Sequence, residues 1–157
     1  MANVTVGMVA PDFELENQHR ALVKLSSFRG SKNVVIVFHP LAFTPVCTVQ
    51  MKGYQEAIAD FTGVDAHILS ISCDPGPSKK AWADSLGGIS YDLLTDFEPK
   101  GAVSQAYGVM HPAGFPERAL FVVDKNGVVA WTAKYDIPEQ PPMAALLDQL
   151  QQIARSQ

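Results

Sequence analysis

Short runs of hydrophobic residues along the chain predict β-strands. The run Asn33–Phe38 is continuous and rich in β-branched residues, which is typical of a strand buried on both faces of a sheet. Ala66–Ser72 is a second run of this kind. The runs 118–123 and 128–132 flank a segment, 124–127, whose Asn-Gly step predicts a hairpin turn. We therefore expect a central strand at 33–38 and an antiparallel pair after residue 117.

Other segments repeat their hydrophobic residues every three or four positions, as on one face of a helix. This spacing predicts helices at 51–61, at 82–86 before a Gly-Gly stop, at about 100–107, and around 146–153. Residues 10–24 alternate loosely and predict a small N-terminal β-hairpin. Because helices connect the first strands, those strands should pair in parallel. The order of elements therefore predicts an α/β fold with a mixed sheet and helices on both faces.

The length and composition limit what such a protein can be. A chain of 157 residues fits one domain, and without an internal repeat or linker we expect residues 1–157 to form it. The net charge of −4 offers no basic excess, so nucleic acid is not expected as a partner. Neither a signal peptide nor an apolar stretch of about 18 residues is evident, which predicts a cytoplasmic protein without membrane contact.

The two cysteines, Cys47 and Cys73, are too few for a disulfide scaffold or a four-ligand zinc site. Cys47 follows the expected central strand and lies near the start of the next helix. Thr44 fits the N-cap of that helix and Pro45 its first position, so the free N–H groups of the first turn would stabilise a Cys47 thiolate. The alternative is that Cys47 is a small buried hydrophobe. Its place at the carboxyl end of a strand, where α/β sheets bind ligands, favours the nucleophile.

At these positions the chain resembles the peroxiredoxins. Pro40, Thr44 and Cys47 match the family signature P-x-x-x-T-x-x-C, and Arg118, at the start of a predicted strand, matches the family arginine. The resemblance includes the Lys-Ala-Trp stretch that ends at Trp82. It is greatest to the AhpE-like group of alkyl hydroperoxide reductases, through Phe-His-Pro-Leu-Ala-Phe-Thr and Gly-Ala-Val-Ser-Gln-Ala-Tyr-Gly-Val.

This resemblance implies a thioredoxin-like fold and a thiol peroxidase that reduces hydrogen peroxide and alkyl hydroperoxides. Cys47 would attack the peroxide and become a sulfenic acid. Arg118 would stabilise negative charge, the Thr44 hydroxyl would bind in the same pocket, and Pro40 would shield the sulfur. The reaction requires no metal or organic cofactor. The family also implies a homodimer built with the loop around Phe43, the Trp82 region and the helix at 100–107.

Two positions are expected to distinguish this chain from its relatives. Many of them carry glutamate where this chain has Gln50, which can orient Arg118 but cannot pair with it as an ion. Cys73 lies at the carboxyl end of the strand expected at 66–72 and precedes a segment, 74–77, that is expected to be irregular. Cys73 is therefore a candidate resolving cysteine. If it is silent, an external thiol of thioredoxin, glutaredoxin or low-molecular-weight type must reduce the sulfenic acid.

Other readings of the same residues remain open. His39 and His111 are candidate bases for a cysteine hydrolase, although a histidine at a strand end is usually bonded locally. A thioredoxin-type disulfide reductase needs a second cysteine where Gln50 stands, which disfavours it. A redox-sensing or chaperone-like binding protein, with Cys47 as an oxidation switch, is the alternative to the peroxidase.

Overall fold

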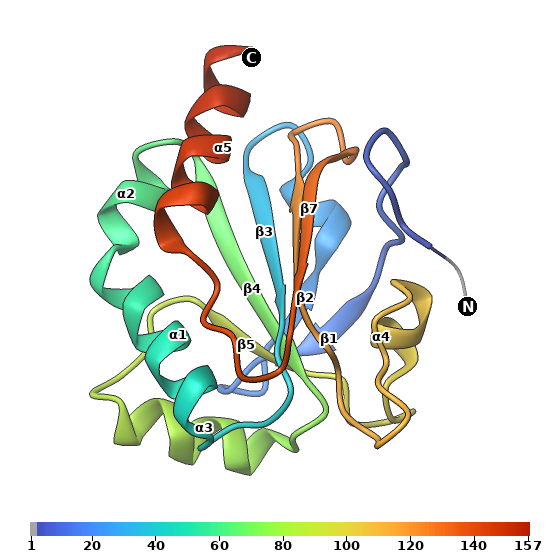
Figure 1. The fold of residues 1–157 in the computed structure, drawn as a ribbon, viewed down its shortest axis with the longest axis vertical. Coiled ribbons are helices and arrows are strands. Elements are labelled where there is room, and N and C mark those ends of the chain that lie inside the picture. The colour runs from blue at the N-terminus through green and yellow to red at the C-terminus, as the bar shows by residue number, and fades with distance from the viewer. Residues whose placement is uncertain (1–2) are drawn as a thin grey trace.

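The computed structural model describes residues 3–157 and contains a five-stranded sheet in the order β5-β4-β3-β6-β7, with a separate two-stranded hairpin (Figure 1). The strands are β1 Glu14–Glu16, β2 Leu22–Lys24, β3 Asn33–Phe38, β4 Ala66–Ser72, β5 Asp92–Thr95, β6 Arg118–Val123 and β7 Val129–Tyr135. The helices are the 3-10 turn η1 Leu25–Phe28 and α1 Pro45–Glu56, α2 Ile58–Thr62, α3 Gly76–Ser85, α4 Ala102–Ala106 and α5 Met143–Arg155.

Strand β3 is the centre of the large sheet, as its continuous hydrophobic run predicts. It pairs in parallel with β4 and antiparallel with β6, so that Val35 lies between Ile68 and Val122. All six of its residues are buried. β6 and β7 form the predicted antiparallel pair. The mixed sheet and the small N-terminal hairpin of the predicted fold class are thus confirmed.

Each face of the sheet is covered by its own set of elements. Alternate residues of β3 point to opposite faces. Val35 and Val37 belong to a core formed with α1, α2, α3 and α5, whereas Ile36 and Phe38 belong to a core formed with the hairpin, η1 and the segment after α4. Figure 1 shows α1, α2 and α5 together on one side and α4 on the other. Helices therefore lie on both faces, as expected.

Some element boundaries differ from the sequence prediction. β5 was not predicted, because Leu93 and Leu94 alone form its hydrophobic run. β5 lies at the edge of the sheet. There the side chain of Gln18, in the turn of the hairpin, accepts a hydrogen bond from the backbone N–H of Leu93 at 2.9 Å. The segment 74–77, predicted to be irregular, contributes its last two residues to α3. Proline is tolerated there because the first helical turn needs no N–H from it.

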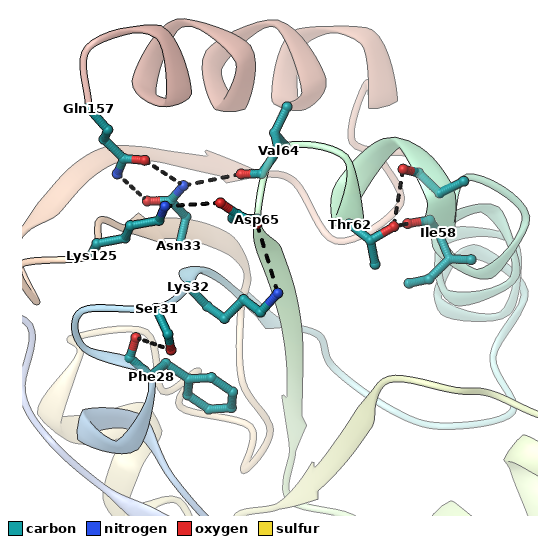
Figure 2. A network of polar contacts seen from close by, with 11 residues as sticks. Phe28, Ser31, Lys32, Asn33, Ile58, Thr62, Val64, Asp65, Lys125 and Gln157 are labelled. Carbon is teal, nitrogen blue, oxygen red and sulfur yellow. Dashed lines mark hydrogen bonds and ion pairs between the residues drawn. The ribbon is translucent and has the colours of Figure 1, made fainter.

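At the amino-terminal end of β3, a polar network joins three parts of the chain (Figure 2). The fully buried Asn33 donates to Gln157 Oε1 at 3.2 Å and accepts from Gln157 Nε2 at 2.6 Å, which ties the end of the chain after α5 to the sheet. Its Nδ2 also lies 3.3 Å from the carbonyl of Val64. Nearby, Lys125 and Lys32 face Asp65 from the surface.

Within residues 3–157, no helix has the length and apolar character needed to cross a membrane.

This network predicts a difference between a buried and an exposed substitution. Asn33→Ala leaves the Val64 carbonyl and the Gln157 amide without their buried partner, so it should lower the free energy of unfolding by about 1–3 kcal/mol. Lys32→Ala removes an exposed charge 4.0 Å from Asp65 and should change it by less than about 0.5 kcal/mol. Urea denaturation of both variants measures the difference. Equal effects would mean that the network adds no stability.

Candidate active site

The candidate nucleophile lies where β3 passes into α1. Thr44 has extended backbone angles at the N-cap and Pro45 is the first residue of the helix, as predicted, which places Cys47 in the first turn. The hydroxyl of Thr44 makes no capping bond. It donates instead to the carbonyl of Leu41 at 2.6 Å, because the loop turns back sharply at Phe43, where φ is +66°. The N–H groups of the first turn are thus left without a side-chain cap.

The loop before α1 is anchored by Asp74, which the sequence analysis did not identify as a functional residue. Its carboxylate accepts the backbone N–H of Ala42 at 2.9 Å and the hydroxyl of Ser72 at 2.6 Å. Because β3 and β4 are parallel neighbours, their carboxyl ends meet at one edge of the sheet. Asp74, two residues beyond β4, can therefore fix the loop that follows β3. The parallel pairing of the two strands was the signal that could have identified it.

Cys47, Arg118 and Gln50 come together from two elements. Arg118 is the first residue of β6, and its Nη1 lies 3.5 Å from the sulfur of Cys47 and 2.9 Å from Oε1 of Gln50. Its Nε donates to the carbonyl of Ile137 at 2.9 Å. Cys47 is completely buried and Arg118 is 2% exposed, so the cation and the sulfur meet away from water. Two fixed acceptors hold the guanidinium toward the sulfur.

The charge of Arg118 is not balanced by a carboxylate. Among residues 3–157, no ion pair within 4.0 Å includes it. Gln50 is neutral, and its amide donates to the hydroxyl of Tyr54 at 2.9 Å. Burial raises the pKa of Tyr54, which keeps that phenol neutral as well. The group that can supply a negative charge to Arg118 is therefore the thiolate of Cys47, and the site can stabilise that anion.

Thr44 and Pro40, two further predicted site residues, lie in the segment between β3 and α1. Pro40 is buried, and Thr44 is partly exposed with its hydroxyl bonded to the loop. The sulfur of Cys47 is covered in this conformation, so a peroxide reaches it only when the covering groups move.

Over the described residues, no three His, Cys, Asp or Glu side chains are grouped so that they could bind a metal ion.

Cys73 is a different kind of thiol. It is partly buried and forms no disulfide with Cys47. Burial, reinforced by the negative charge of Asp96, raises its pKa to about 11. At neutral pH it is therefore a protonated thiol, which is a poor nucleophile.

The histidines do not form the base of a cysteine hydrolase in this structure. His39 is buried and its Nε2 lies 3.0 Å from the amine of Lys79. His111 accepts the backbone N–H of Ala113 and stacks on Phe115 at 4.7 Å. The contact of His39 is with a residue 40 positions away, so the expectation that a histidine at a strand end is bonded locally is wrong here, and its partner Lys79 was not identified from the sequence.

Comparisons with known proteins show what this chain is similar to. A model of the AhpC/TSA family matches residues 6–132. Alkyl hydroperoxide reductase E of Mycobacterium tuberculosis is 45% identical over 127 residues, which cover 80% of this chain and 82% of the relative. Among solved structures, the reduced 2-Cys peroxiredoxin of Plasmodium vivax matches 96% of this chain and 82% of its own, with a TM-score of 0.87 and 27% identity. Peroxidoxin BcpB of Mycobacterium tuberculosis matches 96% and 99%, with a TM-score of 0.85 and 27% identity.

The environment of Cys73 makes its ionisation testable. In a Cys47→Ser variant, we expect the alkylation rate of Cys73 by iodoacetamide to keep rising with pH up to about 11, because the reactive thiolate forms only there. The rate is followed by intact mass, with a cysteine-containing peptide as reference. A rate that levels off near pH 9 would show that burial and Asp96 do not suppress the thiolate.

Proposed function

The chain belongs to the AhpC/TSA family of peroxiredoxins, and on that premise we propose that Cys47 is the residue with which it reduces hydroperoxides. As a peroxiredoxin it is a thiol-dependent peroxidase. The observation that carries the assignment to Cys47 is the contact of 3.5 Å between its sulfur and Arg118, at the first turn of α1. Burial raises the pKa of the Cys73 thiol to about 11, which argues against Cys73 as the nucleophile.

The reaction begins when the Cys47 thiolate attacks the terminal oxygen of the peroxide. A sulfur–oxygen bond forms while the oxygen–oxygen bond breaks, and the sulfur loses two electrons to become a sulfenic acid. The other oxygen leaves as an alkoxide, or hydroxide from hydrogen peroxide, and takes up a proton. Arg118 stabilises the thiolate before the attack and the growing negative charge during it. Gln50 keeps Arg118 in place through the bond of 2.9 Å.

Thr44 and Pro40 shape the site around this contact. The bond from the Thr44 hydroxyl to Leu41 leaves the oxygen lone pairs of Thr44 available, so the hydroxyl can accept a hydrogen bond from the peroxide. Pro40 is buried at the end of β3 and limits access of water to the sulfur. A sulfenic acid in such a site is protected from further oxidation while it waits for a reductant.

An external thiol completes the cycle in this proposal. Cys73 is protonated at neutral pH, which argues against its attack on the sulfenic acid and so against an internal disulfide. The reductant is a thioredoxin, a glutaredoxin or a low-molecular-weight thiol.

We also propose that residues 1–157 act as one peroxiredoxin domain and that this domain works in the cytoplasm, where such thiols keep cysteines reduced.

A homodimer is the proposed assembly. Phe43 is 56% exposed beside the active-site loop, and with Leu41 and Val49 it forms an apolar surface. The α4 region adds an apolar hollow lined by Ala102, Ala106 and Met110. Trp82 and Tyr107 are only 1% and 2% exposed, so they support this surface from within the core and do not contact a partner directly. Exposed apolar surface of this kind is commonly covered by a second subunit.

Substitution of Cys47 and Arg118 tests the catalytic assignment. Cys47→Ser should abolish fast consumption of hydrogen peroxide, and Arg118→Met should slow it by roughly 100- to 1,000-fold, as expected for loss of a group that stabilises transition-state charge. Arg118→Lys keeps the charge without the forked donors and should fall in between. Stopped-flow kinetics measure these rates, and Arg155→Met, at an exposed position of α5, is the control.

The same samples report the product. After one equivalent of peroxide, the intact mass of the protein should increase by one oxygen, and the mass of Cys47→Ser should not change. A loss of two hydrogens would instead identify a bond between Cys47 and Cys73. Fast peroxide consumption by Cys47→Ser would refute the assignment, and a wild-type rate no faster than that of a free thiol would favour the redox-sensing alternative.

The dimer proposal predicts a specific effect of charge at Phe43. Phe43→Asp should convert the dimer to a monomer in sedimentation velocity, because an ionised carboxylate in an apolar interface would have to be desolvated. Aspartate tolerates the positive φ of this position, so the loop itself should survive. Leu22→Asp, at a residue 65% exposed on the hairpin, is the matched control and should remain dimeric. A monomeric wild-type protein would contradict the proposal.

A further inference from the structure

A lysine is fully buried beside the candidate active site. Lys79 of α3 is 0% exposed, and its amine lies 3.0 Å from Nε2 of His39, the residue before Pro40. In the described part of the chain, no carboxylate lies within 4.0 Å of this amine. A buried ammonium without a paired anion costs free energy, and a nonpolar residue of similar length would avoid that cost. Packing alone therefore does not explain a lysine at this position.

His39 is suited to hold Lys79 as a neutral partner. It is 0% exposed, its ring is tilted against Trp82 with the ring centres 5.4 Å apart, and its Nδ1 is one of the buried side-chain atoms without a hydrogen-bond partner among residues 3–157. Burial lowers the pKa of His39 well below its usual value of 6.5, and the charges of Lys79 and Arg118 add to this effect. The ring therefore accepts through Nε2, and the proton of the pair belongs to Lys79.

Lys79 also lies near the first turn of α1. Its amine is 5.8 Å from the centre of the Trp82 ring, and Nε1 of Trp82 donates to the hydroxyl of Thr48, the residue after Cys47, at 3.2 Å.

Burial lowers the pKa of Lys79 to about 7, while negative charge on Asp74, Cys47 and Cys73 acts in the opposite direction. Such coupling is reciprocal: if the Cys47 thiolate favours the ammonium, then the ammonium favours the thiolate by the same free energy. Arg118 also faces this cluster, but its guanidinium keeps its proton at every pH of interest.

We propose that Lys79, held by His39, is a positioning residue of the peroxidase, whose buried ammonium stabilises the Cys47 thiolate only as long as it keeps its proton. This inference rests on the proposed role of Cys47 as nucleophile. Arg118 then supplies a constant positive field, and Lys79 supplies one that changes with pH. The thiolate is therefore stabilised most below the pH at which Lys79 loses its proton.

The pH profile of peroxide reduction tests this role. In the wild-type protein, the second-order rate constant with hydrogen peroxide should decline above about pH 7 as Lys79 deprotonates, because the negative charge shared by the sulfur and the leaving oxygen in the transition state then loses this cation. Lys79→Met, which keeps the length of the side chain, should lose the decline. The rate of this variant should also be about tenfold lower near pH 6, the size expected for loss of one nearby charge.

The neighbouring Lys80 provides a matched control. It lies on the same helix, but its side chain is 47% exposed and its amine is 2.6 Å from Asp84. Lys80→Met should follow the wild-type profile. His39→Phe keeps a ring against Trp82 but cannot accept a hydrogen bond, so it should behave like Lys79→Met. His39→Gln retains an acceptor oxygen and should restore most of the wild-type profile.

A direct titration of the thiolate by its absorbance at about 240 nm separates this role from a structural one. Lys79→Met should raise the pH at which Cys47 ionises, with unchanged circular dichroism. The proposal is overturned if Lys79→Met and Lys80→Met give the same titration and the same pH profile as the wild type. If Lys79→Met does not fold, the wild-type profile and the His39 variants still decide. Loss of peroxide reduction in all proteins, the wild type included, would instead refute the proposed function.

Discussion

The site depends on one constraint, a buried guanidinium that has no carboxylate to balance it. Arg118 is fixed at the first position of β6, and the pairing of Phe38 with Ala119 sets that position beside the end of β3. α1 begins after the same strand, so the register of two central strands brings Arg118 and Cys47 to the same point. The sheet does not merely support the site. It determines which cation meets the sulfur and at what distance.

Gln50 changes how this constraint is met. A glutamate there would balance Arg118 by itself and would compete with the thiolate for its charge. Glutamine gives Arg118 a hydrogen-bond acceptor without a negative charge, with the Ile137 carbonyl as a second fixed acceptor. The positive charge therefore remains available for Cys47. Glutamine in place of glutamate at position 50 thus removes an ion pair with Arg118, and the positive field of Arg118 on the Cys47 sulfur becomes stronger.

Much of this arrangement could be predicted from the sequence, for identifiable reasons. β3 and β4 were found because both are buried on two faces and read as continuous hydrophobic runs. Thr44 and Pro45 marked the helix start, since cap positions have local preferences. β5 was missed because it is short and its edge is bonded to a side chain, Gln18.

The roles of Asp74 and Lys79 could not be predicted, because each depends on a contact between elements far apart in the sequence. Asp74 reaches Ala42, 32 residues away, and Lys79 reaches His39, 40 residues away. Lysine and aspartate are usually exposed, so their residue type predicts that Asp74 and Lys79 lie on the surface. The same applies to the hydroxyl of Thr44, whose position was predicted but whose hydrogen bond follows the sharp turn at Phe43.

The two halves of the cycle make opposite demands on the same sulfur. Attack on peroxide is fastest when the thiolate faces fixed positive charge away from water, and the buried contact of Cys47 with Arg118 meets that demand once a small peroxide has been admitted. Reduction of the sulfenic acid requires a second thiol to reach the sulfur, and burial prevents it. Oxidation itself reduces this conflict, because a neutral sulfenic acid no longer balances Arg118. The attraction that keeps the sulfur inside is lost at the step after which it must be exposed, and the first turn of α1 has no side-chain cap to hold it.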